Sequence, residues 1–281
     1  YVALADTYSL LKLYDVESNP DAYRLAREYA EKALLLDDNL SEAHASIAYL
    51  KFYADRDRSG AELDFRRAVQ LNPSNAQSHH WFALFFSAVG THADAVQEIE
   101  QAKKIDPRSL SVLAASGMVY FFAGNFQAAI EECDKALKIE PTFMPAIKVK
   151  RWTYSAMGDK ESAAAAFTKE INYGGGDLSQ PGWRIIAAHA NKLGEGPAEA
   201  LLQLNEAAKD EAIRSNPYAF AFETALAYNA LGQTDKAFEY LADAEIARSH
   251  GFNFIEVDPR LANLQKDPRF ARLIERLGDS K

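Results

Sequence analysis

Apolar residues recur along this chain with the period of an α-helix, in helix-length segments separated by glycine and proline. Segment 126–139, FQAAIEECDKALKI, places its apolar residues on one helical face and opposite charges four residues apart on the other. The preceding segment 110–123 is more apolar and has small residues at 115–117 that would let a second helix approach closely. Gly124 ends the first helix and Pro141 ends the second, so the pattern predicts a helix hairpin.

This hairpin repeats along the chain every 34 residues. Three columns of identical residues carry the period: Pro73, Pro107 and Pro141; Gly90, Gly124 and Gly158; and Ala68, Ala102 and Ala136. A fixed period of this length is typical of a solenoid, in which each helix pair buries its apolar face against its neighbours.

The columns resemble the tetratricopeptide repeat (TPR) family. In one unit the residues that match the family pattern are Phe82, Ala83, Phe86, Gly90, Ala95, Ile99, Ala102 and Pro107. The resemblance covers residues 1–247, and the second unit is one residue longer than the norm. It implies an all-α, right-handed superhelical solenoid of about seven helix-turn-helix repeats.

The fifth unit departs from the family pattern. Lys150 and Arg151 stand where a large apolar and a small residue are usual, and Glu170 replaces an alanine. Because a buried charge is costly unless it is paired, we expect Arg151 or Lys150 to reach Glu170 or solvent.

A glycine-rich stretch, YGGGDLSQPG at 173–182, follows the fifth unit and is either a joint in the array or a longer loop. The expected organisation is an N-terminal array at 1–172, this joint at 173–182, two further repeats at 183–247 and a capping segment at 248–281.

The last segment leaves the 34-residue pattern. Its two DPR phrases, 258–260 and 267–269, are typical of helix starts, with Asp as the N-cap and Pro in the first turn. The end of a solenoid needs a polar outer face, so the final helix at 267–277 is expected to be a cap.

Composition limits the classes of function. The net charge of −9 argues against a broad nucleic-acid or anionic-membrane surface, and no apolar run approaches the roughly 20 residues of a membrane span. The single cysteine, Cys133, allows no internal disulfide and suits a reducing compartment, so we expect the cytoplasm rather than the periplasm. The chain opens at Tyr1 without Met, which suggests a fragment or a processed chain.

Nothing in the pattern indicates catalysis, and we expect a non-enzymatic protein without cofactor or metal. The six histidines form no metal-binding motif, and the adjacent His79 and His80 point to different helix faces. Cys133 lies on the apolar face of its helix and is expected to be a buried structural thiol. The sequence has no phosphate-binding glycine loop and no nucleophile-elbow serine.

The remaining candidate is a partner groove on the first helices, which line the concave side in the family. Large residues form a second stripe beside the core columns of these helices, where they are exposed unless something covers them. Alternatively, they pack against the adjacent first helix. The candidate groove residues are Tyr49, Phe52, Tyr53, His80, Leu84, Met118, Phe121, Phe122, Lys148, Trp152, Arg184 and Asn191. Of these, Lys148, Arg184 and Asn191 give the groove a more basic end.

The resemblance implies a scaffold that binds a protein or peptide partner in this aromatic-rich groove, with its oligomeric state open and without direct nucleic-acid binding. Some family members clamp a terminal carboxylate with Lys, Asn and Arg, but this chain has Val2, Asp6 and Ser46 where such a clamp would start. Two alternatives remain. The chain is the sensor part of a larger bacterial signalling or transcriptional regulator, or it binds a small apolar ligand around Trp152.

Overall fold

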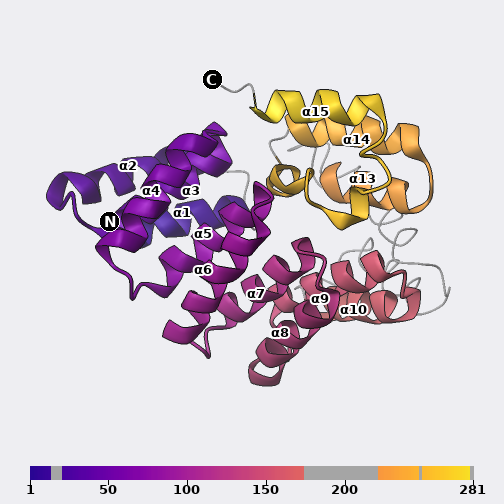
Figure 1. Cartoon of the computed structure of the whole chain (residues 1–281), viewed down its shortest axis with the longest axis horizontal. Coiled ribbons are helices and arrows are strands. Elements are labelled where there is room, and N and C mark those ends of the chain that lie inside the picture. Colours follow the sequence, from indigo (N-terminus) through magenta and orange to yellow (C-terminus); the bar gives the residue numbers. More distant parts are fainter. Residues whose placement is uncertain (14–20, 174–220, 247–248, 279–281) are drawn as a thin grey trace. The chain divides into compact units, whose positions relative to one another are not determined.

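The computed structural model describes residues 1–13, 21–173, 221–246 and 249–278. Within these residues the chain is all-helical and contains no strand, which confirms the predicted all-α class (Figure 1). Its contacts divide it into two compact units, one of residues 1–107 with 274–281 and one of residues 108–273.

The first unit consists of three helix pairs joined in sequence. The pairs are α1 (Val2–Leu13) with α2 (Ala22–Leu36), α3 (Ser41–Leu50) with α4 (Arg58–Leu71), and α5 (Ala76–Ala88) with α6 (His92–Ile105). Between α3 and α4 lies a short π-helix, η1 (Lys51–Asp55). The loops of the second and third pairs are short, so each of these pairs is an antiparallel hairpin.

The second unit continues the same arrangement. Its described pairs are α7 (Leu110–Phe122) with α8 (Phe126–Ile139), α9 (Met144–Met157) with α10 (Lys160–Tyr173), and α13 (Ala221–Ala230) with α14 (Thr234–Ile246). Two short 3-10 helices follow, η2 (His250–Phe254) and η3 (Pro259–Leu261), and α15 (Pro268–Gly278) begins in this unit. The repeat predicted within 183–247 ahead of α13, and residues 174–182 of the predicted joint, lie outside the described residues.

The first helices α5, α7, α9 and α13 end in a left-handed turn at a glycine. Gly124 and Gly158, for example, both have a φ of 74°, a conformation that only glycine adopts at little cost. Arg56 occupies the matching place in the second pair with a φ of 59°, and among the described residues it is the one non-glycine residue with a positive φ. The fold therefore fixes this turn, and glycine is the residue that fits it most easily.

The extra residue of the second repeat is taken up inside its first helix. A π-helical turn holds one residue more than an α-helical turn, and η1 places this turn just before Arg56. The amide of Asp57 then donates to the carbonyl of Lys51 at 2.9 Å. As a result α4 starts in register, and its Ala61 and Ala68 are fully buried like the equivalent residues of the other pairs.

Small residues bring the two helices of each pair together. Two alanine columns on the second helices have no exposed surface: Ala61, Ala95, Ala129 and Ala163, and Ala68, Ala102 and Ala136. The larger residues Phe65, Ile99, Cys133 and Phe167 are buried between these columns and fill the remaining space.

Helix α7 closely approaches α8 at Gly117. A Cβ atom at Gly117 would lie 2.5 Å from Cys133 Sγ and 3.1 Å from the carbonyl oxygen of Ala129. This confirms that the small residues in the middle of α7 allow close packing, and that Cys133 is a buried thiol.

The charged residues of the fifth repeat are paired as expected. Arg151 Nε donates to Glu170 Oε2 at 2.7 Å, and both side chains are largely buried. Lys150 donates to Asp134 of α8 at 2.5 Å. The family's apolar contact between α9 and α10 is thus replaced by an ion pair that has a hydrogen bond.

Both DPR phrases start helical turns. The amide of Arg260 donates to Asp258 Oδ1 at 2.9 Å, and the amide of Arg269 donates to Asp267 Oδ1 at 2.9 Å. The first phrase starts only the 3-10 helix η3, whereas the second starts α15, close to the predicted 267–277. None of the described helices is both long and apolar enough to span a bilayer.

A Gly117→Ala substitution should test the close approach of α7 and α8. Alanine favours a helix, yet its methyl group would overlap Cys133 Sγ, so we expect a loss of about 1–3 kcal/mol in the free energy of unfolding. Urea unfolding followed by circular dichroism measures this loss. In a Cys133→Ala background the sulfur is gone and the cost of Gly117→Ala should shrink; an equal cost in both backgrounds would show that this contact is not its cause.

Candidate functional site

The predicted groove residues come from the first helices of successive pairs. In the first unit, α3 and η1 carry Tyr49, Phe52 and Tyr53, and α5 carries His80 and Leu84. In the second unit, α7 carries Met118, Phe121 and Phe122, and α9 carries Lys148 and Trp152. Arg184 and Asn191 lie outside the described residues.

Half of the described candidates are buried. Tyr49, Phe52, Tyr53, Phe121 and Phe122 all belong to the buried core of their units. His80, Leu84, Met118, Lys148 and Trp152 remain partly exposed. The predicted stripe therefore divides into a buried aromatic layer and a partly exposed set of residues.

Neighbouring first helices cover the aromatic layer of the first unit. The ring of Tyr49 lies 5.0 Å from that of Trp81 on α5, and the ring of Phe52 meets Phe85 edge-on at 5.3 Å. This is the alternative interpretation of the stripe, packing against the adjacent first helix. Edge-on and tilted ring pairs add about 0.5–1.5 kcal/mol each beyond the area that they bury.

In the second unit, the layer is covered by the segment between α14 and α15. The ring of Phe254 stacks on Phe122, with centroids 4.7 Å apart and an interplanar angle of 9°. The guanidinium of Arg260 lies 4.8 Å from the ring centre of Trp152 and 5.5 Å from that of Phe121. Phe121 has no exposed surface, so a partner meets this ring only if the covering segment moves.

A polar cluster joins the first helices of the three pairs in the first unit, α1, α3 and α5. Ser46 of α3 donates its hydroxyl to Asp6 of α1 at 2.6 Å, and the side-chain amide of Gln77 on α5 donates to the same carboxylate at 2.7 Å. Asn75 donates to Glu42 at 2.8 Å. Burial, and to a smaller extent the charge of Glu42, raises the pKa of Asp6 above its ordinary value.

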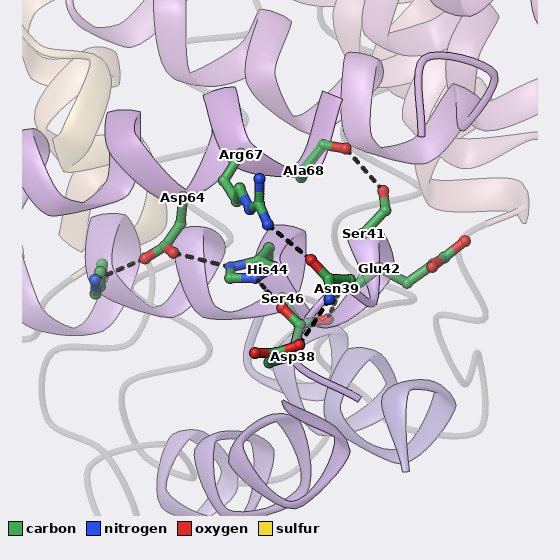
Figure 2. Close-up of polar contacts among 10 residues, drawn as sticks. Asp38, Asn39, Ser41, Glu42, His44, Ser46, Asp64, Arg67 and Ala68 are labelled. Atoms are coloured by element: carbon green, nitrogen blue, oxygen red, sulfur yellow. Dashed lines mark hydrogen bonds and ion pairs between the residues drawn. The ribbon is translucent and has the colours of Figure 1, made fainter. Parts of the chain in front are cut away.

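Two histidines each link the first helix of a pair to the second helix of the same pair. Figure 2 shows His44 of α3, whose Nδ1 lies 3.1 Å from Asp64 of α4 and whose Nε2 lies 3.0 Å from the carbonyl oxygen of Asp38. Lys51 donates to the same Asp64 at 2.6 Å.

His79 repeats this arrangement in the next helix pair. Its Nδ1 lies 2.5 Å from Glu98 of α6, and its Nε2 lies 3.0 Å from the carbonyl oxygen of Pro73. Both ring nitrogens face acceptors, and only the protonated imidazole donates to both. The hydrogen bond to Glu98 therefore raises the pKa of His79 above 6.5, despite partial burial.

Sequence reasoning missed this histidine arrangement because it searched the histidines only for metal motifs. The signal was present: each histidine lies near the start of a first helix and has an acidic residue 19 or 20 positions later on the second helix. The described residues contain no cluster of three or more His, Cys, Asp or Glu side chains that could hold a metal ion.

The cysteine offers little chemistry in the folded chain. Burial raises the pKa of Cys133 to about 12, so its sulfur is a protonated thiol at neutral pH. It packs in the core cluster of α7, α8 and α9 rather than on either inner face.

Residues 110–143, which contain α7 and α8, match the family model described as a tetratricopeptide repeat. These residues form a tetratricopeptide repeat, and the described chain has the fold of a helical-repeat solenoid. No curated protein sequence is significantly similar to it.

Solved structures show the same TPR fold. TTC0263, a thermophilic TPR protein of Thermus thermophilus, is 20% identical, with 67% of this chain and 100% of that one covered and a TM-score of 0.54. A tetratricopeptide repeat protein from Parabacteroides merdae is 12% identical, with coverage of 98% and 100% and a TM-score of 0.54. PilW, a type IV pilus biogenesis factor, is 19% identical, with coverage of 96% and 98% and a TM-score of 0.50.

The raised pKa of His79 predicts a pH dependence of the free energy of unfolding. The contribution of His79 should be complete below pH 6.5 and lost as the pH rises through its folded-state pKa. His79→Gln should cost about 2 kcal/mol in mildly acidic solution, the usual value of a charged hydrogen bond, and less at high pH. Chemical unfolding of both proteins at a series of pH values measures this difference.

The adjacent His80 is the matched control. Burial lowers its pKa to about 4, so His80→Gln should relieve a loss of stability that appears as the pH falls below 6.5. In mildly acidic solution the two substitutions should thus change the free energy of unfolding in opposite directions, His79→Gln lowering it and His80→Gln raising it. A difference between wild type and His79→Gln that does not change with pH would contradict the assignment.

Proposed function

We propose that the chain is a non-enzymatic scaffold that binds a protein or peptide partner on the inner faces of its first helices. The TPR fold supports the general class, because stacked helix pairs present an extended surface. The observation that carries the proposal is the inner face of α5. This helix has no Asp, Glu, Lys or Arg, and its Gln77, His80 and Leu84 share one face and retain exposed surface.

The polar cluster adds chemistry to one end of this face. Gln77, one helical turn before His80 on α5, donates a hydrogen bond to the carboxylate of Asp6. The burial of Asp6 near Glu42 makes an incoming basic group favourable there, since it would offset a costly negative charge. A partner segment with a basic residue at this end and an apolar residue at Leu84 fits the first unit.

In the second unit, the partly exposed candidates are Met118, Lys148 and Trp152. Lys148 is the described member of the more basic end that the sequence predicts, whose other residues, Arg184 and Asn191, lie outside the described residues. Within each unit the buried aromatic residues of the predicted stripe pack among the first helices, Tyr49, Phe52 and Tyr53 in the first unit and Phe121 and Phe122 in the second.

Phe121 is a poor choice for testing partner binding. A residue that lines an open groove can be truncated with little loss of folding. Because Phe121 is fully buried, its truncation should instead cost about 3–5 kcal/mol of stability, as for other core aromatic residues.

A leucine pair gives a cleaner test. Leu84 lies on the proposed inner face, whereas Leu63 lies on the second helix α4 and is 71% exposed. Peptides selected from a random displayed library on the immobilised chain should bind Leu84→Glu at least about tenfold more weakly than the wild type, because a charge cannot be desolvated there. Leu63→Glu should leave the affinity unchanged, as measured by isothermal titration calorimetry.

Two results would argue against this function. One is a selection that enriches no peptide over the blank surface. The other is a set of selected peptides whose affinity falls equally in both leucine variants, or in neither, while circular dichroism shows that both are folded.

The structure does not favour the small-ligand alternative, because the space around Phe121, Phe122 and Trp152 is taken by Phe254 and Arg260. The regulator alternative stays a prediction, which the coding sequence upstream of Tyr1 would test.

A further inference from the structure

The segment that covers α7 and α9 is not a repeat. It follows Ile246, leaves the 34-residue pattern, and forms the two 3-10 turns η2 and η3 instead of a helix pair. An irregular segment laid against helices in this way has the form of a bound peptide rather than of a further repeat.

Its contacts with α7 and α9 are ring contacts. Phe254 stacks on Phe122, and the flat guanidinium of Arg260 lies over Trp152 and Phe121. These three ring-bearing residues of α7 and α9 are the ones that the sequence marks as a partner groove. Trp is the aromatic residue that attracts a cation most strongly, and a planar guanidinium also stacks on it.

Its hydrogen bonds run to a different helix. Asn229 of α13 donates to the carbonyl oxygen of Arg260 at 2.7 Å and exchanges bonds of 2.8 and 2.9 Å with Asn263. Arg260 is also paired with Asp258 of the same segment at 2.5 Å. The segment is thus held to α13 by hydrogen bonds and to α7 and α9 by stacked rings, and its Phe254 is buried in that contact.

We propose that the inner face of α7 and α9 is a peptide-docking surface and that residues 249–264 occupy it as an internal ligand. The partner is an extended peptide that presents an aromatic ring to Phe122 and an arginine to Trp152 and Phe121, and it docks by displacing this segment. The inference rests on the proposed scaffold function and names the partner chemistry for the second unit.

The covalent attachment of residues 249–264 determines how tightly the surface binds an added peptide. An attached ligand competes at a high effective concentration, so an outside peptide meets a free surface only in the fraction of molecules whose segment is displaced. The apparent affinity for the partner is reduced by that fraction. Weakening the attached segment should therefore strengthen binding of a peptide added in solution.

The two DPR phrases provide a matched pair of variants. Arg260 and Arg269 are each bonded to the Asp of their own phrase, but the guanidinium of Arg269 lies 4.1 Å from the ring centre of Phe238 on α14. Arg260→Ala removes a contact with α7 and α9, whereas Arg269→Ala removes a similar contact elsewhere.

The probe is a fluorescently labelled synthetic peptide of residues 249–265, and its anisotropy is measured against the full chain. Arg260→Ala should bind it about tenfold or more tightly than the wild type or Arg269→Ala does, because its own segment is weakened. Adding Trp152→Ala to Arg260→Ala should reverse the gain. A peptide in which alanine replaces the arginine should bind none of these proteins measurably.

Equal affinity of the three full-length proteins for the peptide would overturn the proposal. So would a loss of helical content in Arg260→Ala, because the segment would then be part of the core. Arg260→Lys keeps a charge for Asp258 but loses the planar stack, so it should stay folded and bind with intermediate affinity; wild-type affinity in this variant would also count against the proposal. Peptides that depend on Leu84 test the scaffold function separately, so the internal ligand can fail while that function stands.

Discussion

The close approach of two helices at small side chains is the constraint on which the rest of this structure depends. Alanine columns on the second helices, and Gly117 on α7, leave no room for a larger residue. Because each pair closes in the same way, the same apolar surface remains on every pair, and it is buried only against the next pair. The aromatic layer on the first helices follows from this geometry, since large rings fill the space that small residues leave between successive pairs.

Much of the fold could be predicted from the sequence, because each helix pair packs in the same way and needs the same residue types at the same positions. The 34-residue columns located the helix pairs, the buried thiol of Cys133 and the need of Arg151 for an acidic partner at Glu170. The π-helix could not be placed, because a spacing shows one extra residue without showing whether a helix or a loop absorbs it. The turn at Arg56 was likewise hidden, since no glycine marks it.

The candidate site was harder to predict than the fold, and for a different reason. Helical spacing tells which side chains share a face, but not what lies over that face. Phe122 and Trp152 both belong to the predicted groove set, and Phe254 and Arg260 lie against them from more than a hundred residues away. Contacts of that range leave no local pattern in one sequence, and neither does the polar cluster that joins Asp6 to Gln77. Burial therefore separated the groove residues into supporting and partly exposed sets only when the three-dimensional packing was known.

Because Cys133 is buried, the rate at which its thiol is alkylated depends on how often the surrounding helices separate. A thiol with a pKa of about 12, enclosed between α7 and α8, cannot react with an alkylating reagent until those helices separate. Because no other cysteine competes for the reagent, each modified sulfur records one opening of that repeat. The rate of labelling therefore reports the local breathing of a single helix pair inside an otherwise intact solenoid, without any engineered probe.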